Sequence, residues 1–425
     1  MDTTPFHLIL FALDIVVWGG LFLWFRHRRN KDAGRSSTYY FEKSLFVPVA
    51  VRRSSFVWDI SGVILFGGFA LVCFAVFARL IFTDFAQKHI YRFNVGQCIV
   101  EGIALHGTLF LIVAASLLYW NRRHVTAAIF GCCAFCLAAL GFNMLYWEPY
   151  HLRVEHYEIR TSKIKRPLRI VFVSDIQTDR IGSHEINTLR KIQQQNADLI
   201  ILGGDYIQTY EYTPEQHLPE KFRQMFFDHP LEAPLGVYAV AGNIGGHAGA
   251  SDADLFEGTS VKFIRNTVVF DHLGEEEGWE PPIDLVLLSL GHSTGGLGER
   301  GLTDSGNFIV MAGHYPNFAI DGYTNPDTGV TRSGYRNAER APDLMLAGHT
   351  HGGQVVLPFY GPVPFGGGKY LETDQVPRRM RKGFFAYPNG GHLLVTRGSG
   401  MERGWAPRIR LFCPAEISVI NIIPE

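Results

Sequence analysis

Long apolar stretches dominate the first third of the chain. Four of them reach about 20 residues, the length that a helix needs to cross the roughly 30 Å hydrocarbon core of a bilayer. They are His7–Phe25, Ile60–Phe82, Ile99–Trp120 and Val125–Trp147. The pattern therefore predicts an all-α transmembrane bundle of about four helices within residues 1–150, with the lipid bilayer as its partner.

From about residue 168 the pattern changes to short β-branched runs that end in polar or glycine-rich turns. Such runs are typical of buried strands, and we predict them over 168–174, 199–202, 236–241, 308–312 and 343–347. The stretch 185–196, between the first two strands, has helical spacing, so this part forms a βαβ unit. The chain is thus expected to divide into a transmembrane module, 1–150, and an α/β domain, 151–425.

Charge changes at the same place. Residues 1–150 hold 13 Lys and Arg against 8 Asp and Glu, a net charge of +5, whereas residues 151–425 hold 26 against 32, a net charge of −6. A net-negative domain is a poor match for a phosphate backbone, so we expect no nucleic-acid partner. Five of the six cysteines lie in the apolar part and only Cys413 in the domain, so no disulfide framework is expected.

The basic residues also predict how the chain crosses the membrane. They gather after the first apolar stretch, between Arg26 and Arg53, and between the third and fourth stretches, at Arg122 and Arg123. Cytoplasmic loops carry such an excess of Lys and Arg. We therefore expect a multi-pass protein of the plasma or inner membrane, with the α/β domain on the extracytoplasmic side. This expectation holds only for an even number of spans.

Residues with metal-binding side chains follow five of the predicted strands. Taken singly, each has a simpler explanation: an Asp or Asn after a strand is usually a turn residue, and a lone His usually makes an ordinary hydrogen bond. Together they indicate a shared function, because ligands bind outside the carboxyl ends of strands in α/β sheets. Oxygen and imidazole donors converging at one sheet edge are what a pair of divalent cations requires. The residues are Asp175, Asp205, Asn243, His314, His349 and His351.

The order of these motifs resembles the calcineurin-like metallophosphoesterase superfamily. More narrowly, it resembles the membrane-anchored branch, in which transmembrane helices precede the catalytic domain. The resemblance covers roughly residues 148–425 and rests on Gly-Gly-Asp ending at Asp205, on Gly242-Asn243, and on Gly-His-Thr-His-Gly-Gly over 348–353. It implies an αββα sandwich, in which two β-sheets pack face to face with helices on both outer faces.

The resemblance also implies two divalent metal ions and a hydrolytic reaction. One ion would be held by Asp175, Gln177, Asp205 and His351, and the other by Asp205, Asn243, His314 and His349. A hydroxide bridging the two ions would attack phosphorus in line. The catalytic roles would then fall to Asp205, Asn243 and His349.

Two positions depart from the family pattern. Gln177 stands where the family usually has histidine, and its neutral amide oxygen is a weaker ligand than imidazole. We therefore expect Mn²⁺ as the main ion, with Mg²⁺, Fe and Zn²⁺ as alternatives. Ile244 stands where the family usually has a histidine that stabilises or protonates the leaving group. His247, in the same loop, is a candidate substitute.

Without that acid, a leaving group that departs as a phosphate or phosphoester anion is favoured over an alkoxide. The sequence thus predicts a membrane-anchored, metal-dependent hydrolase of a phosphodiester or pyrophosphate bond in a phosphorylated small molecule or a lipid-linked or envelope substrate. The alternative is a catalytically impaired protein on the same fold that binds phosphate or a partner. His292 and Arg397 are further candidates for contact with substrate or for support of the site, and each also has a purely structural interpretation.

Overall fold

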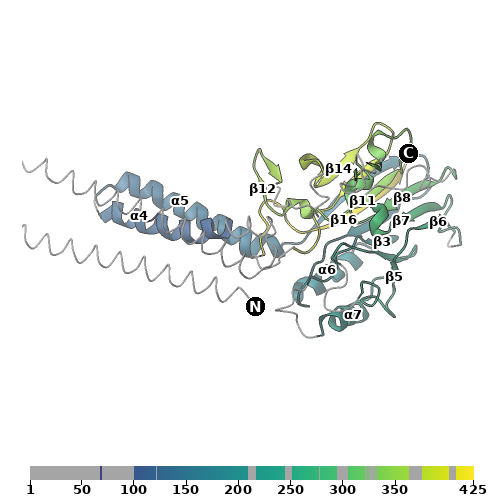
Figure 1. Cartoon of the computed structure of the whole chain (residues 1–425), viewed down its shortest axis with the longest axis horizontal. Helices are drawn as coiled ribbons and strands as arrows, with labels where there is room; N and C mark the ends of the chain where they lie inside the picture. Colours follow the sequence, from purple (N-terminus) through teal and green to yellow (C-terminus); the bar gives the residue numbers. More distant parts are fainter. Residues whose placement is uncertain are drawn as a thin grey trace, which may run out of the picture. The chain divides into compact units, whose positions relative to one another are not determined.

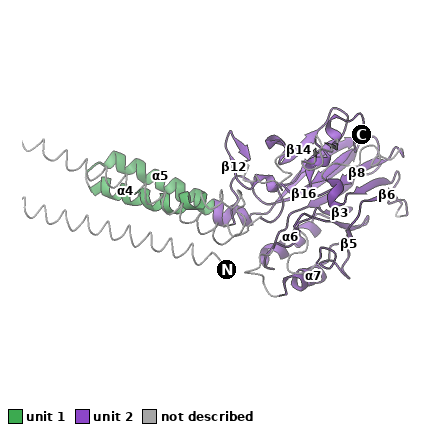
Figure 2. Cartoon of the chain, in the orientation of Figure 1, with its two compact units in different colours: residues 1–90, 94–143, 405–407 green, residues 91–93, 144–404, 408–425 purple. Residues whose placement is uncertain are grey.

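The chain forms two compact units (Figure 2). One contains Asn94–Asn143, and the other contains Met144–Gly404 and Arg408–Glu425. The computed structural model describes residues 68, 100–120, 122–208, 217–244, 251–276, 278–293, 305–320, 323–324, 331–332, 334–362, 376–401 and 408–425.

The described part of the first unit is helical. A π-helical turn, η1 (Ile103–Gly107), leads into α4 (Thr108–Trp120), and α5 (His124–Phe142) follows after a short turn. Two stretches, Val100–Trp120 and His124–Tyr150, are long and apolar enough to cross a membrane. They correspond to the third and fourth predicted spans. The first two, His7–Phe25 and Ile60–Phe82, lie outside the described residues.

The second unit is built around two six-stranded sheets (Figure 1). The first sheet runs in the order β1 (Arg153–Thr161), β16 (Glu416–Pro424), β2 (Leu168–Val173), β3 (Leu199–Leu202), β4 (Val237–Val240) and β5 (Val261–Ile264). The second sheet runs in the order β14 (Gly383–Ala386), β15 (His392–Val395), β11 (Leu344–Ala347), β8 (Phe308–Ala312), β7 (Ile283–Leu287) and β6 (Val268–Leu273). All five strands that the sequence predicts are present.

Smaller elements complete the described part of the unit. The helices are α6 (Ser183–Gln193), α7 (Leu218–Asp228) and α8 (Leu290–Ser293). Two short antiparallel pairs join β9 (Tyr323–Thr324) to β10 (Thr331–Arg332) and β12 (Val356–Leu357) to β13 (Gly361–Pro362). The π-helical turn is η2 (Asn143–Trp147), and the 3₁₀ turns are η3 (Glu148–Tyr150), η6 (Pro316–Phe318), η7 (Tyr335–Asn337), η8 (His351–Gly353) and η10 (Arg378–Met380).

Parallel strands form the centre of both sheets. In the first sheet β2, β3, β4 and β5 are parallel, and in the second β7, β8, β11 and β15 are parallel. The central strands β3, β4, β8 and β11 are buried along their whole length. Sheets covered on both faces require such continuous apolar strands, which explains why the sequence shows runs here and not alternation.

The two sheets pack face to face, as the resemblance implied. Their inner faces share one apolar cluster, in which Phe172 and Ile201 of the first sheet meet Val310 and Leu346 of the second. Helices α6 and α7 cover the outer face of the first sheet (Figure 1). The αββα expectation is therefore correct for the sheets and for this face.

The outer face of the second sheet differs from the expectation. Among the described residues it is covered by single turns, such as η6, η7 and η10, which contribute Phe318, Tyr335 and Met380 to its apolar cluster. Glycine and proline in these connections, for example Pro316 and Gly334, disfavour helices of several turns.

Candidate metal centre

The residues predicted to bind metal lie just after the carboxyl ends of five strands. Asp175, Asp205 and Asn243 follow β2, β3 and β4 of the first sheet, whereas His314 follows β8 and the His349–His351 turn follows β11 of the second. The expectation of one sheet edge was therefore wrong in this respect. Local patterning locates strand ends, but it does not reveal which sheet a strand joins.

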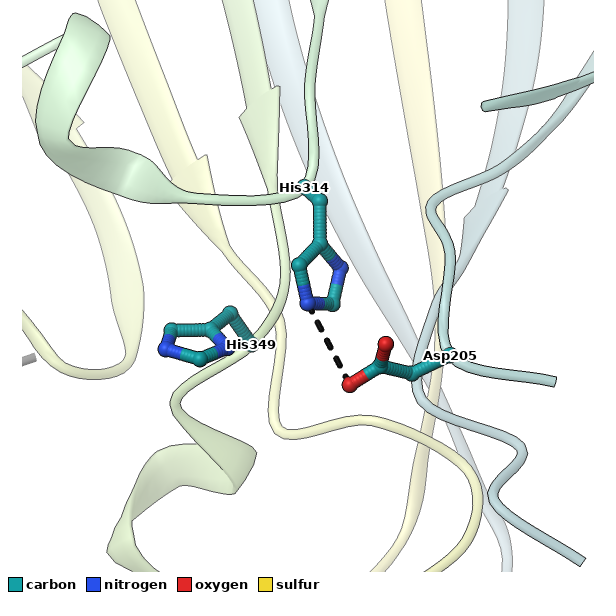
Figure 3. A group of neighbouring side chains, drawn as sticks. All are labelled: Asp205, His314 and His349. Atoms are coloured by element: carbon teal, nitrogen blue, oxygen red, sulfur yellow. Dashed lines mark ion pairs between the residues drawn. The ribbon is translucent and has the colours of Figure 1, made fainter. Parts of the chain in front are cut away.

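Asp205, His314 and His349 form the centre of the cluster (Figure 3). One ligand atom from each lies within 4.8 Å of the others, and all three residues are buried. His314 Nε2 is 3.3 Å from Asp205 Oδ2 and 2.7 Å from Asn243 Oδ1. The other ring nitrogen, Nδ1, lies 2.8 Å from the carbonyl oxygen of Gly203, which fixes the imidazole and leaves Nε2 facing the cluster.

The remaining predicted ligands join this centre through the two aspartates. Gln177 Nε2 donates to Asp205 Oδ2 at 3.1 Å. The backbone N–H of His349 donates to both carboxylate oxygens of Asp175, at 3.1 and 3.0 Å, and His351 Nε2 is 3.6 Å from Asp175 Oδ1. The structure thus brings all seven predicted residues into one group, in which six are buried and Asn243 is exposed.

The backbone at these residues is strained. Five of the seven, Asp175, Gln177, Asp205, His349 and His351, have a positive φ, between 37° and 67°. Residues other than glycine rarely adopt this left-handed backbone conformation, and strained residues of this kind are concentrated at functional sites. Neighbouring glycines make room: a Cβ on Gly242 would lie 2.1 Å from Asp205 Oδ1, and one on Gly348 would lie 2.0 Å from Ser174 Oγ.

Electrostatics couples Asp205 to His314. Burial alone would raise the pKa of Asp205, but the charge of His314 and its hydrogen bond hold that pKa well below its usual range. Burial likewise opposes charge on His314, but the carboxylate of Asp205 outweighs it and raises the pKa of His314 to about 9. Without metal, a proton on His314 therefore neutralises Asp205 at neutral pH.

The other two imidazoles are neutral. Burial, reinforced by the like charge of His314, holds the pKa of His349 well below its usual value. Burial and the nearby charge of Arg410 lower the pKa of His351 to about 3. Burial raises the pKa of Asp175 to about 7, against the attraction of His314. Neutral imidazole is the form that binds metal, so both turn histidines are ready to act as ligands.

Unpartnered atoms show that the group suits cations. Gln177 Oε1, His349 Nε2 and His351 Nδ1 are buried and have no hydrogen-bond partner. A buried polar atom without a partner costs about 1–3 kcal/mol and calls for an explanation. Divalent cations would satisfy atoms of this kind, because the donors are carboxylate and amide oxygens and neutral imidazole nitrogens.

The other three candidate residues, His247, His292 and Arg397, are not among the predicted ligands of this cluster. His247 lies outside the described residues. His292 Nδ1 is 2.7 Å from Thr267 Oγ1 and 3.1 Å from Ser289 Oγ, contacts that favour its structural interpretation. Arg397 forms ion pairs with Glu155 and Glu416, both at 2.7 Å, so its guanidinium is engaged by acidic neighbours.

Two residues next to the cluster were missed by the sequence analysis. The ring of Tyr315 packs against that of His349, with centroids 4.2 Å apart. Its position directly after His314 was a usable signal. Arg410 is completely buried behind the Arg397–Gly400 loop, and no local sequence feature marks it as a neighbour of the cluster.

Fold and cluster together define a class of protein, the α/β sandwiches whose strand ends present ligands for divalent cations. Residues 168–353 match the model of the calcineurin-like phosphoesterase family. The chain therefore carries a calcineurin-like phosphoesterase domain, and the resemblance of this domain to the superfamily is confirmed. This family comprises metal-dependent hydrolases of phosphoester bonds.

Relatives over most of the domain have informative names. The chain is 27% identical to YkuE of Bacillus subtilis, an uncharacterized metallophosphoesterase, over 71% of this chain and 97% of YkuE. It is 25% identical to the phosphodiesterase YaeI of Escherichia coli, over 67% of this chain and 93% of YaeI. It is 27% identical to the UDP-2,3-diacylglucosamine pyrophosphatase LpxG of Chlamydia muridarum, over 61% of this chain and 84% of LpxG.

Proposed function

We propose that this chain is a membrane-anchored hydrolase that uses two divalent ions, Mn²⁺ foremost, to cleave a phosphodiester or pyrophosphate bond. One ion would be held by Asp175, Gln177, Asp205 and His351, and the other by Asp205, Asn243, His314 and His349. The observation that carries the proposal is the set of buried ligand atoms without partners at the meeting point of the two sheets.

The contacts of Asp205 support a place between the two ions. Its Oδ2 meets both Gln177 and His314, one from each ligand set, and its Oδ1 accepts the backbone N–H of Ile244 at 2.9 Å. When bound, divalent ions would activate water at neutral pH and neutralise charge on the phosphate. The chain's own part is to hold the ligands rigidly, through Gly203 for His314 and the His349 backbone for Asp175.

The surroundings of Ile244 support the choice of bond. Its side chain donates no proton, and its backbone N–H is already used by Asp205. A leaving group that departs as a stable anion needs no acid at this position, whereas an alkoxide does. The names of YaeI, a phosphodiesterase, and LpxG, a pyrophosphatase, agree with this choice.

The membrane part of the proposal rests on the two apolar helices. His124–Trp147 would be about 36 Å long as a helix, enough to cross the hydrocarbon core. Exposed Tyr119 and the basic Arg122 and Arg123 lie near one end, and exposed Tyr146 and Trp147 lie at the other. Aromatic residues favour both membrane interfaces. A lipid-linked substrate and an extracytoplasmic position of the domain belong to the same proposal.

A second candidate function is phosphate or partner binding without catalysis. The presence of Gln177 and Ile244 where the family usually has histidine favours it. Metal content separates the two: a binder needs no paired ions, whereas the hydrolase needs about two per chain.

Activity of the purified full chain in detergent tests the proposed bond. With Mn²⁺ present, bis(p-nitrophenyl) phosphate should be cleaved faster than p-nitrophenyl phosphate, and Asp205→Asn should abolish both reactions. Faster cleavage of the monoester would overturn the preference for diesters. No cleavage of either ester or of a nucleotide-sugar pyrophosphate, with no metal bound, would favour the binding protein.

A further inference from the structure

Arg410 has surroundings that an ordinary buried side chain does not need. It is completely buried and is the largest of the fully buried side chains in the described part of the domain. The hydrogen bonds that the structure gives its guanidinium go to backbone carbonyls and to Cys413 Sγ, none to a carboxylate. Burying a cation in this way is costly, so the arrangement indicates a role beyond stability.

Most of these bonds hold one loop. Nη2 donates to the carbonyl oxygens of Arg397, at 2.8 Å, and Gly398, at 3.3 Å, and both Nε and Nη2 donate to that of Gly400. The planar guanidinium presents several donors in a fixed fork, which suits three carbonyls of one turn. On its other side Nη1 donates to the carbonyl of Cys413 at 2.8 Å, which ties the loop to the segment before β16.

The same loop holds the strained backbone of Asp175. The N–H of Gly400 donates to the carbonyl of Asp175 at 2.8 Å, and the N–H of Ser399 donates to that of Ser174 at 3.0 Å. Two glycines allow this approach: a Cβ on Gly398 would lie 2.8 Å from Asp175 Cβ, and one on Gly400 would lie 1.8 Å from the carbonyl oxygen of Ile176. The loop therefore supports the left-handed conformation of Asp175, whose φ is 56°.

We propose that Arg410 is a positioning residue for the metal centre: through the Arg397–Gly400 loop it holds Asp175 in place for the first metal ion, without contacting metal or substrate. The inference rests on the proposed two-metal function. It applies to the ion held by Asp175, Gln177 and His351. The second ion would be held by Asp205, Asn243, His314 and His349, and none of the hydrogen bonds described for this loop goes to these four residues.

The test is Mn²⁺ binding by the full chain in detergent, measured by isothermal titration calorimetry together with metal content. Arg410→Gln removes the charge and the fork, and Arg410→Lys keeps the charge alone. Arg169→Gln is the matched control, because Arg169 also donates to a backbone carbonyl, that of Gln195 at 3.0 Å, but it is exposed and lies on β2 away from Asp175. Asp175→Asn and His314→Ala define the loss of the first and of the second ion.

We expect Arg410→Gln to weaken one of two Mn²⁺ sites by about 10- to 100-fold, the usual cost of losing a residue that supports a metal ligand. Its binding curve should match that of Asp175→Asn and differ from that of His314→Ala. The Mn²⁺ affinity of Arg410→Lys should lie between those of the wild type and Arg410→Gln, and Arg169→Gln should bind Mn²⁺ as the wild type does.

Other outcomes contradict the proposal. Unchanged affinity at both sites in Arg410→Gln, or equal weakening at both, would reduce Arg410 to a structural residue while the two-metal function stands. A wild type that binds no Mn²⁺ would overturn the proposed function, and the role of Arg410 with it. If Arg410→Gln does not fold, Gly398→Ala decides, since its added Cβ presses on Asp175 and should weaken the same single site.

Discussion

Strands β7 and β8 carry a buried polar group near each of their ends, and the two groups differ. Near the amino ends, the fully buried Asp284 accepts hydrogen bonds from the backbone of His272 and from Asn307 Nδ2, both at 3.0 Å, and from Ser305 Oγ. After the carboxyl end of β8, His314 belongs to a group in which Gln177, His349 and His351 each leave a buried atom without a partner.

The comparison separates structural from functional burial. A buried carboxylate that serves the fold is surrounded by donors, because an unsatisfied group would lower stability. In the group after the carboxyl ends, by contrast, buried atoms of Gln177, His349 and His351 have no hydrogen-bond partner, and the backbone is strained. Both features are typical of ligand-binding sites. Polar residues at the two ends of the same strands should therefore respond to mutation in opposite ways.

The largest effect is expected for Asp205→Asn. Loss of the carboxylate removes the residue shared by both proposed sites, so metal affinity and kcat/KM should fall by more than about 100-fold, beyond the cost of losing a supporting neighbour. Metal content and hydrolysis of bis(p-nitrophenyl) phosphate measure it. Retention of two ions and of activity would remove Asp205 from the site.

Asp284→Ala should lower the stability of the fold and leave metal binding unchanged. It leaves three donors without their acceptor, so the free energy of unfolding should fall by about 3 kcal/mol, while metal content per folded chain stays at the wild-type value. Urea unfolding of the full chain followed by tryptophan fluorescence gives the first quantity. A selective loss of metal, with stability unchanged, would contradict the distinction between the two groups.

Sequence reasoning located the centre of the fold and missed its margins. The central strands were predictable because continuous apolar runs mark strands covered on both faces. Edge strand β6, half exposed along much of its length, carries no such mark. The position of β16 was beyond local reasoning, since it pairs with β1 and β2 more than 240 residues earlier in the chain.

The candidate site was likewise predictable where local sequence marks it and not where it depends on long-range packing. Asp175, Asp205, Asn243, His314, His349 and His351 were predicted as ligands because each lies within a few residues of the end of a strand. The division between two sheets and the support from Arg410 depend on long-range packing, which no local pattern encodes. Only the structure shows that Arg397, a candidate for contact with substrate or for support of the site, forms ion pairs with Glu155 and Glu416.

Metal binding should depend on pH through His314. The pKa of His314 in the metal-free chain is about 9, so an ion bound at Nε2 must displace a proton below that pH. Affinity should therefore rise about 10-fold per pH unit between pH 7 and 8 and level off above pH 9. Calorimetry in two buffers of different ionisation enthalpy counts the protons released. An affinity independent of pH, with no proton release, would exclude His314 as a ligand.

A smaller effect is expected from Gln177→His, which restores the usual family residue. Imidazole is a stronger ligand than an amide oxygen, and it suits Zn²⁺. The first site should bind severalfold more tightly, up to about 10-fold or 1.4 kcal/mol, with Zn²⁺ gaining more than Mn²⁺. Competition titrations with the two ions measure the change. Gln177→Leu is the control and should weaken the site; equal affinities in both variants would mean that position 177 is not a ligand.

Our proposal for this site is that its seven predicted ligands bind two divalent cations. It is tested most directly by the metal content of the full chain, purified from medium supplemented with Mn²⁺ and measured by inductively coupled plasma mass spectrometry beside Asp205→Asn. We expect about two divalent ions per wild-type chain and a clear loss in the variant. A folded wild type without divalent ions, even after addition of excess Mn²⁺, would contradict it.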